Sequence, residues 1–110
     1  MLMDLETRVK MTKRATRFAL KRLVEKGCKL KTVDDGGEED EWIDVTEKPI
    51  KEVLEDIMAV DMAQLLIENP EGKEKWIQFV FGNAPNEIIC NYHCCSTIDE
   101  VADEVYTKFE

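Results

Sequence analysis

The chain has 110 residues and a formal net charge of −9, with 44% hydrophobic and 35% charged side chains. This hydrophobic fraction excludes an intrinsically disordered chain, and the length predicts a single domain over residues 1–110. No apolar run approaches the ~18 residues of a transmembrane helix, and we expect no signal peptide, so the sequence predicts a soluble cytoplasmic protein.

Charge is distributed unevenly along the chain. Residues 1–31 carry ten basic and three acidic side chains, a net charge of +7, whereas residues 32–110 carry five basic and 21 acidic ones, a net charge of −16. Most of such a surface would repel phosphates, so we do not expect direct binding of nucleic acid by the body of the protein. The basic first segment leaves a local contact open.

Hydrophobic periodicity predicts the elements of the first half. Residues 4–26 place apolar and threonine side chains on one stripe at helical spacing. The stripe consists of Leu5, Val9, Thr12, Thr16, Ala19, Leu20 and Leu23. Gly27 suits the position just after this helix, and residues 28–33 alternate like a half-buried strand. Residues 42–45 form a second strand after the acidic loop 34–41, which indicates a hairpin.

A second helix is predicted after this hairpin. Pro49 fits its first turn, with Thr46 or Lys48 near the cap, because proline has no amide hydrogen to lose there. The apolar spacing places the end of this helix near Val60.

Strands and one helix follow in the second half. Strands are predicted over residues 62–68, 76–81 and 88–94, and the last helix begins at a capping box of Thr97 and Glu100. The order is α-β-β-α-β-β-β-α, and short turns between consecutive strands favour antiparallel pairing. We therefore predict an α+β fold, with an antiparallel sheet of about five strands and three helices.

One cysteine-rich segment raises the question of a metal site. In a strand, Cys90 and Cys94 would lie about 13 Å apart, too far to bind one zinc ion. His93 and Cys95 would share the other face but need two more ligands, for which only Cys28 or a carboxylate is available. We predict no metal and no cofactor, and interpret Cys90 and Cys94 as small buried residues with free thiols. A metal-dependent function at His93 and Cys95 is the third alternative.

No catalytic pattern stands out. His93 is the only histidine, and the sequence offers it no evident oxyanion donor or orienting carboxylate. Nucleophile elbows, phosphate-binding glycine loops and the H-E-x-x-H motif are all missing from the sequence. The paired carboxylates fall on outer helix faces, where solvation keeps them inert. We predict a protein that is not an enzyme.

Acidic side chains of the second and third helices and of the hairpin tip form a candidate anionic patch for a basic partner. They are Glu38, Glu39, Asp40, Glu52, Glu55, Asp56, Asp99, Glu100, Asp103 and Glu104. Like charges four residues apart destabilise a helix by about 0.2–0.5 kcal/mol each, so their accumulation points to a use beyond folding. The alternative is that they only keep the protein soluble.

The first helix carries a second candidate surface, a basic row with an apolar flank that also includes Ala15. Its residues are Lys10, Met11, Lys13, Arg14, Arg17, Phe18 and Lys21. A helix that is apolar on two sides is wedged between elements or contacts a partner. We expect the basic row to pair with the acidic body or with a second copy in a homodimer; a phosphate backbone or another anionic partner is the alternative.

Four segments carry a resemblance to known proteins: the Thr/Arg-rich residues 12–20, the acidic residues 34–39, the apolar residues 76–83, and residues 87–89. Together they resemble small uncharacterised α+β proteins of bacteriophages and other mobile elements. The resemblance implies a protein that acts on a host component, and it transfers no catalytic residue.

These observations combine into one expected function. We expect a small acidic interaction or regulatory protein, encoded by a phage or mobile element, that binds a basic host or phage protein, with a nucleic-acid-binding protein as one candidate. The alternative is a nucleic-acid-associated regulator that uses the basic N-terminal helix.

Overall fold

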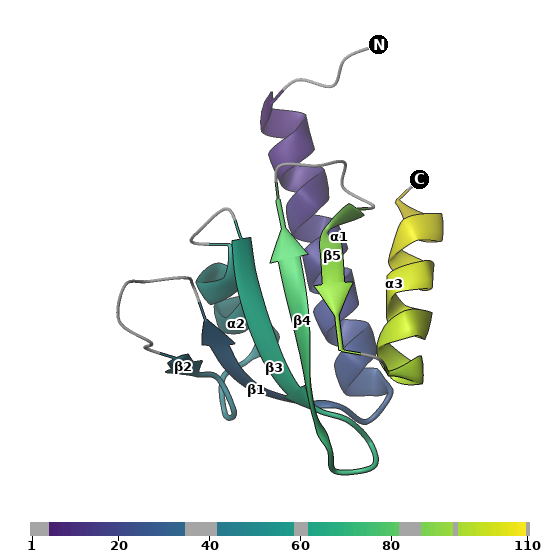
Figure 1. Cartoon of the computed structure of the whole chain (residues 1–110). Helices are drawn as coiled ribbons and strands as arrows, with labels where there is room; N and C mark the ends of the chain where they lie inside the picture. The colour runs from purple at the N-terminus through teal and green to yellow at the C-terminus, as the bar shows by residue number, and fades with distance from the viewer. Residues whose placement is uncertain (1–4, 35–41, 59–61, 82–86, 94, 110) are drawn as a thin grey trace.

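The elements follow one another in the predicted order in the computed structural model (Figure 1). The structure describes residues 5–34, 42–58, 62–81, 87–93 and 95–109. Within these residues the helices are α1 (Leu5–Glu25), α2 (Ile50–Ile57) and α3 (Ser96–Lys108). The strands are β1 (Lys29–Asp34), β2 (Trp42–Asp44), β3 (Met62–Glu68), β4 (Glu74–Val80) and β5 (Ile89–Tyr92).

The five strands form one antiparallel sheet with the order β2-β1-β3-β4-β5. The predicted α+β class is therefore confirmed. The β3–β4 hairpin turns at residues 69–73, one of the short turns predicted between consecutive strands. The Asn69 side chain accepts the amide protons of Glu71 and Lys73 at 3.1 and 2.9 Å, and Gly72 has a φ of +82°. A positive φ favours glycine because it has no Cβ to clash with the backbone.

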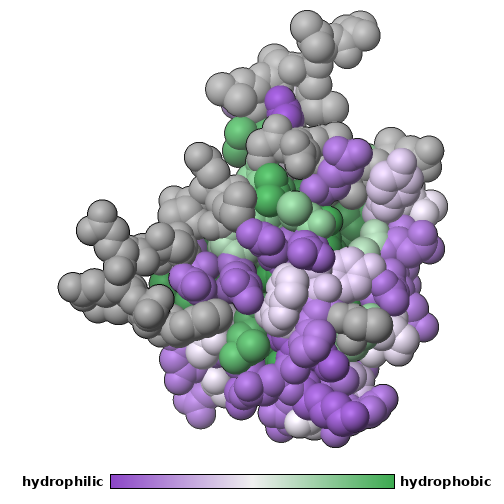
Figure 2. Space-filling model, viewed as in Figure 1, coloured by the Kyte–Doolittle hydropathy of each residue, from purple (hydrophilic) through white to green (hydrophobic). Residues whose placement is uncertain are grey.

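Helices α1 and α2 lie behind the sheet in Figure 1 and contact its strands, and α3 stands beside β5 and packs on α1. Alternate side chains of β3 and β4 point into this layer and are fully buried, as period-two alternation requires. They include Leu65, Ile67, Ile77 and Phe79. The opposite face carries the half-buried Gln64, Leu66, Trp76 and Gln78, and Figure 2 shows it as a mosaic of hydrophilic and hydrophobic residues.

Helix α1 is longer than the sheet beneath it. Its 21 residues span about 31 Å, against about 23 Å for the seven residues of β3. The N-terminal end of α1 projects beyond the strands (Figure 1). The stripe prediction is therefore wrong at Val9, which is 52% exposed, although Thr12, Leu20 and Leu23 are buried as predicted. Ala15, expected on the outer flank, lies in the core.

The C-terminal end of α1 confirms the role predicted for Gly27. Its amide donates to the Val24 carbonyl at 3.0 Å, and the Cys28 amide donates to the Leu23 carbonyl at 2.9 Å. This pair of bonds closes the helix in a Schellman motif, which needs a positive φ at the central residue. Gly27 supplies it, with a φ of +95°.

The prediction that Thr46 or Lys48 lies near the cap of α2, with Pro49 in the first turn, is wrong. Pro49 occupies the N-cap position, and no side chain caps the helix. Thr46 belongs instead to the turn after β2, where its amide donates to Asp44 at 2.9 Å. This bond is the main reason why the pKa of Asp44 is lowered. The helix ends at Ile57, before the expected Val60, which lies outside the described residues.

The capping box predicted for α3 is also wrong. The N-cap residue is Cys95, and the helix already includes Thr97. Glu100 binds Lys26, the residue that follows α1, instead of reaching back to the start of its own helix. A tertiary ion pair has thus replaced the local contact that the pattern predicted.

Candidate functional site

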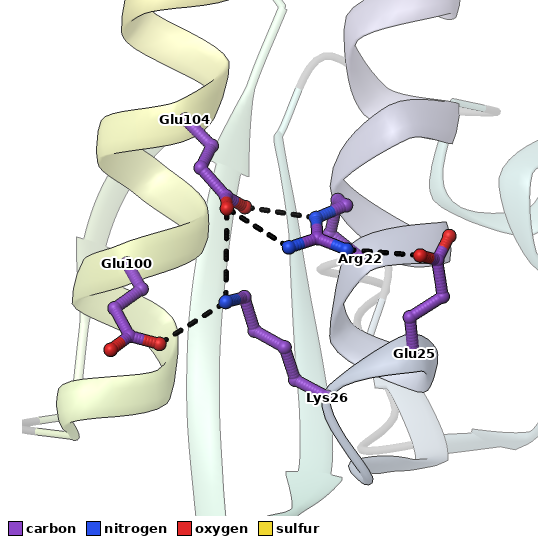
Figure 3. A network of polar contacts seen from close by, with 5 residues as sticks. All are labelled: Arg22, Glu25, Lys26, Glu100 and Glu104. Atoms are coloured by element: carbon purple, nitrogen blue, oxygen red, sulfur yellow. Dashed lines mark hydrogen bonds and ion pairs between the residues drawn. The ribbon is translucent and has the colours of Figure 1, made fainter.

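An ion-pair network lies at the C-terminal end of α1 (Figure 3). Arg22 donates from Nε and Nη2 to the two carboxylate oxygens of Glu104, both at 3.0 Å, and from Nη1 to Glu25 at 2.9 Å. Two parallel bonds between a guanidinium and a carboxylate are the strongest form of such a contact. They raise the pKa of Arg22 and lower the pKa of Glu104.

Lys26 extends this network to the first turns of α3. Its Nζ lies 3.1 Å from Glu100 and 3.7 Å from Glu104. Two members of the predicted anionic patch, Glu100 and Glu104, are therefore bound to α1 of the same chain. Their charge is largely compensated and contributes little to attracting a partner.

The remaining acidic residues of the patch fall into two groups. Helices α2 and α3 both contact α1, which lies between them (Figure 1). The α2 group contains Glu52, Glu55 and Asp56, and the α3 group contains Asp99 and Asp103. Asp56 pairs with Lys48 at 2.9 Å, and Asp99 accepts the hydroxyl proton of Tyr92.

Three other members of the patch are exposed. They are Glu52, Glu55 and Asp103, and they make no ion pair with the cations that the structure describes. Glu38, Glu39 and Asp40 lie outside the described residues.

A groove of about 510 Å³ lies between the N-terminal half of α1 and α2. We call it the cationic groove and define it by its lining residues. They are Thr7, Lys10, Met11, Lys13, Arg14, Arg17, Lys51 and Leu54. The volume is in the range of ligand-binding clefts, about 300–1,000 Å³. Five of the eight described lining residues are cations, and the half-buried Met11 supplies apolar surface, whereas Leu54 is only 3% exposed.

The cations of the cationic groove differ in their ion pairing from the cations at the other end of α1. Lys13, Arg14, Arg17 and Lys51 make no ion pair with any carboxylate in the described part of the chain. Lys10 pairs with Glu6 at 3.6 Å, but both side chains are more than 70% exposed, so water screens the contact. At the C-terminal end of α1, Arg22 and Lys26 are thus paired with carboxylates, whereas Lys13, Arg14 and Arg17 have no such partner among the described residues.

Two residues predicted for the basic and apolar surface lie elsewhere. The Phe18 ring packs edge-to-face on Phe109 at a centroid distance of 5.8 Å, and Lys108 Nζ lies 4.7 Å from the Phe18 ring centroid. The C-terminal end of α3 therefore covers Phe18. Lys21 is exposed on α1 but does not line the groove.

The sequence predictions missed the α2 side of the groove. Lys51 is exposed on α2 and Leu54 belongs to its buried side, and neither position by itself indicates a groove. Only the packing of α2 beside α1, about 40 residues apart in sequence, shows that they share a groove with Lys13 and Arg14. A sequence pattern without this topology carries no signal for the pairing.

The cysteine assignments are partly wrong. Cys90 is exposed and Cys95 is buried, the reverse of the strand alternation that we expected. Cys90 is the extra residue at an irregularity in the β4–β5 register, where Gln78 pairs with Asn91 and Phe79 with Ile89, whereas Cys95 lies beyond β5 at the N-cap of α3. Cys94 lies outside the described residues. Cys28 is buried, and burial raises the pKa of its thiol, which favours the unreactive protonated form.

The proposed metal ligands are not assembled in the described part of the chain. His93 is exposed and stacks on Trp76 at a centroid distance of 6.3 Å, whereas Cys95 is buried. Among the described residues, no group of three histidine, cysteine or acidic side chains lies close enough to bind a metal ion.

Comparisons with known proteins add no assignment to this geometry. The chain matches no protein-family model, no curated protein and no solved structure. The helices of the described residues include none with the length and apolar character needed to cross a membrane.

Proposed function

We propose that this protein is a non-enzymatic binding module and that the cationic groove is its docking surface for an anionic segment of a partner protein. The supporting observation is that four of the five groove cations lack a carboxylate partner among the described residues, although the chain has a net charge of −9. Glu100 and Glu104 bind Arg22 and Lys26 instead.

The energetics favour an incoming anionic partner. Lys13 and Arg14 precede Arg17 by four and three residues, so each lies one helical turn from it and repels it. A bound carboxylate relieves this repulsion. The groove cations are exposed, so each new contact contributes about 0–1 kcal/mol.

Charge reversal inside and outside the groove tests the proposal. The groove variant carries Lys13→Glu, Arg14→Glu and Arg17→Glu. The matched control carries Lys21→Glu, Lys29→Glu and Lys73→Glu, three exposed cations that do not line the groove. Both variants change the net charge by the same amount, so a difference between them reports position alone.

The probe is a fluorescent poly-glutamate peptide of about 20 residues, with affinity measured by anisotropy at low salt. Three lost contacts of about 0.7 kcal/mol each predict about a 30-fold weaker affinity for the groove variant. The control should lose no more than about threefold. Equal losses in the two variants would show that net charge, rather than the groove, governs binding.

A second candidate function uses the exposed acidic side chains to bind a basic protein. The observation in its favour is that Glu52, Glu55 and Asp103 have no ion-pair partner among the described residues. The test compares poly-lysine binding by a Glu52→Lys/Glu55→Lys variant with a Glu71→Lys/Glu87→Lys control. Specific loss in the first variant supports this function, and equal loss in both excludes a role for α2.

A further inference from the structure

We propose that the occupant of the cationic groove is an acidic amphipathic helix of the partner protein, an inference that rests on the proposed function. The lining carries two chemistries side by side, a set of cations and the half-buried apolar side chain of Met11, beside the nearly buried Leu54. A ligand that matches both must present carboxylates and apolar side chains together. An amphipathic helix does so along one stripe and its two flanks.

The hydrogen bonds that the ligand backbone needs also favour a helical ligand. The groove is lined by side chains of two helices, whose internal amides are already hydrogen-bonded within each helix. The described lining residues include no strand edge to which an extended peptide could add. A peptide that leaves water here must satisfy its own amide and carbonyl groups, and a helix does this internally.

The dimensions fit a short helix. The lining residues of α1 run from Thr7 to Arg17, a rise of about 15 Å, which corresponds to about three turns of a bound helix. Lys10, Lys13 and Arg17 recur at intervals of three and four residues. Carboxylates at the same helical spacing on a partner would face them along the whole groove.

A nucleic acid fits the surroundings less well. Duplex DNA carries one charge per about 1.7 Å of its axis and would extend past the 15 Å groove. The same helix that supplies Lys51 and Leu54 exposes Glu52 and Glu55, and these carboxylates would repel the continuing phosphates. A helix of about three turns ends within the groove, so it brings fewer negative charges near these carboxylates than a duplex does.

Two peptides of about 14 residues test the inference. The first has leucines at alternating spacings of three and four residues with glutamates on both flanks; the second is a scrambled sequence of identical composition and charge. Anisotropy gives both affinities, and far-ultraviolet circular dichroism shows whether helix forms on mixing. We expect the amphipathic peptide to bind at least about tenfold more tightly and to gain helix.

Variants separate the apolar and ionic contributions. Met11→Ser should reduce the preference for the amphipathic peptide to within about threefold, because Met11 is half-buried and its loss leaves the cations in place. The groove variant Lys13→Glu/Arg14→Glu/Arg17→Glu should weaken both peptides. The melting temperature of each variant is measured to check that the variant remains folded.

The outcomes distinguish the inference from the proposed function. Equal affinities for the two peptides, both lost in the groove variant, would overturn the helical occupant and leave the function standing. Binding of neither peptide would overturn the function itself. Tighter groove-dependent binding of a duplex of about 20 base pairs, or a groove-dependent dimer in sedimentation velocity, would replace the helix by nucleic acid or by a second copy.

Discussion

Arg22 joins the C-terminal end of α1 to α3 through its two hydrogen bonds to Glu104. Replacing it by alanine removes these bonds and leaves Glu104 facing only Lys26 at 3.7 Å. We predict that Arg22→Ala lowers the melting temperature by a few degrees, whereas Lys21→Ala, at an exposed position, leaves it unchanged. Arg22→Lys should fall between the two because it keeps the charge but not the paired geometry. Equal melting temperatures for all four proteins would contradict the role of this contact.

Glu104 also predicts a pH dependence of stability. Hydrogen bonding to Arg22 lowers its pKa below the ordinary value of 4.5, so folding favours the charged form. The stabilisation is complete above the unfolded-state pKa and is lost as the pH falls through the lower folded-state pKa. Denaturant titrations should therefore show the wild type more stable than Glu104→Gln at pH 7, with the difference shrinking below pH of about 4.5. A constant difference from neutral to acidic pH would exclude this linkage.

The sequence identified the side chains of the site better than it identified the residues that they contact. Lys10, Lys13, Arg14 and Arg17 were identified from their shared helix face, and all four line the groove. The contact of Arg22 with Glu104 joins residues 82 positions apart, and no local pattern encodes it. This long-range pairing distinguishes the cations that have a carboxylate partner from those that have none among the described residues.

At the level of elements, α1 has two halves with different surroundings. Leu20 is fully buried over the sheet, whereas Val9 is 52% exposed near the projecting end. Leu20→Ala should reduce the free energy of unfolding by about 2–5 kcal/mol, and Val9→Ala should change it by less than about 0.5 kcal/mol. Urea denaturation measures both values. A large loss at Val9 would show that the projecting end is covered in solution.

The junction between α1 and β1 depends on Gly27. A residue with a Cβ is strained at its φ of +95°, although the added atom would meet Pro70 at an ordinary 3.5 Å. Gly27→Ala should therefore cost roughly 1–2 kcal/mol of unfolding free energy, and Gly27→Asn should cost less because asparagine tolerates this conformation better. Identical stabilities of the two variants in urea would contradict a conformational cause.

The order and type of the elements followed from periodicity, because a helix and a half-buried strand leave different apolar spacings. The ends and faces of some elements did not. The capping box at Thr97 gave way to the tertiary contact of Glu100 with Lys26, and the irregular register beside Gln78 reversed the exposure of Cys90. Both differences come from contacts between distant segments.

For the whole molecule, the arrangement of charge matters more than its sum. The net charge is −9, yet the helix layer places the basic α1 between two helices that carry acidic residues (Figure 1). Binding to the groove should weaken steeply with salt, because the screening length falls from about 10 Å at 0.1 M to about 3 Å at 1 M. Isothermal titration with the poly-glutamate peptide checks this. Affinity independent of salt would indicate apolar binding alone.

Several sequence predictions concern the protein beyond its fold. The resemblance to phage proteins, a cytoplasmic location, a homodimer and the lack of enzymatic activity stay predictions. The groove proposal does not depend on any of them, because it follows from the side chains that line α1 and α2.

The most direct measurement is a map of amide chemical shifts during titration with the acidic amphipathic peptide. The account predicts shifts concentrated in residues 7–17 of α1 and 51–54 of α2, with the Arg22 to Glu104 contact unchanged. Shifts confined to α3 or to the exposed face of the sheet, or no shifts at saturating peptide, would contradict it.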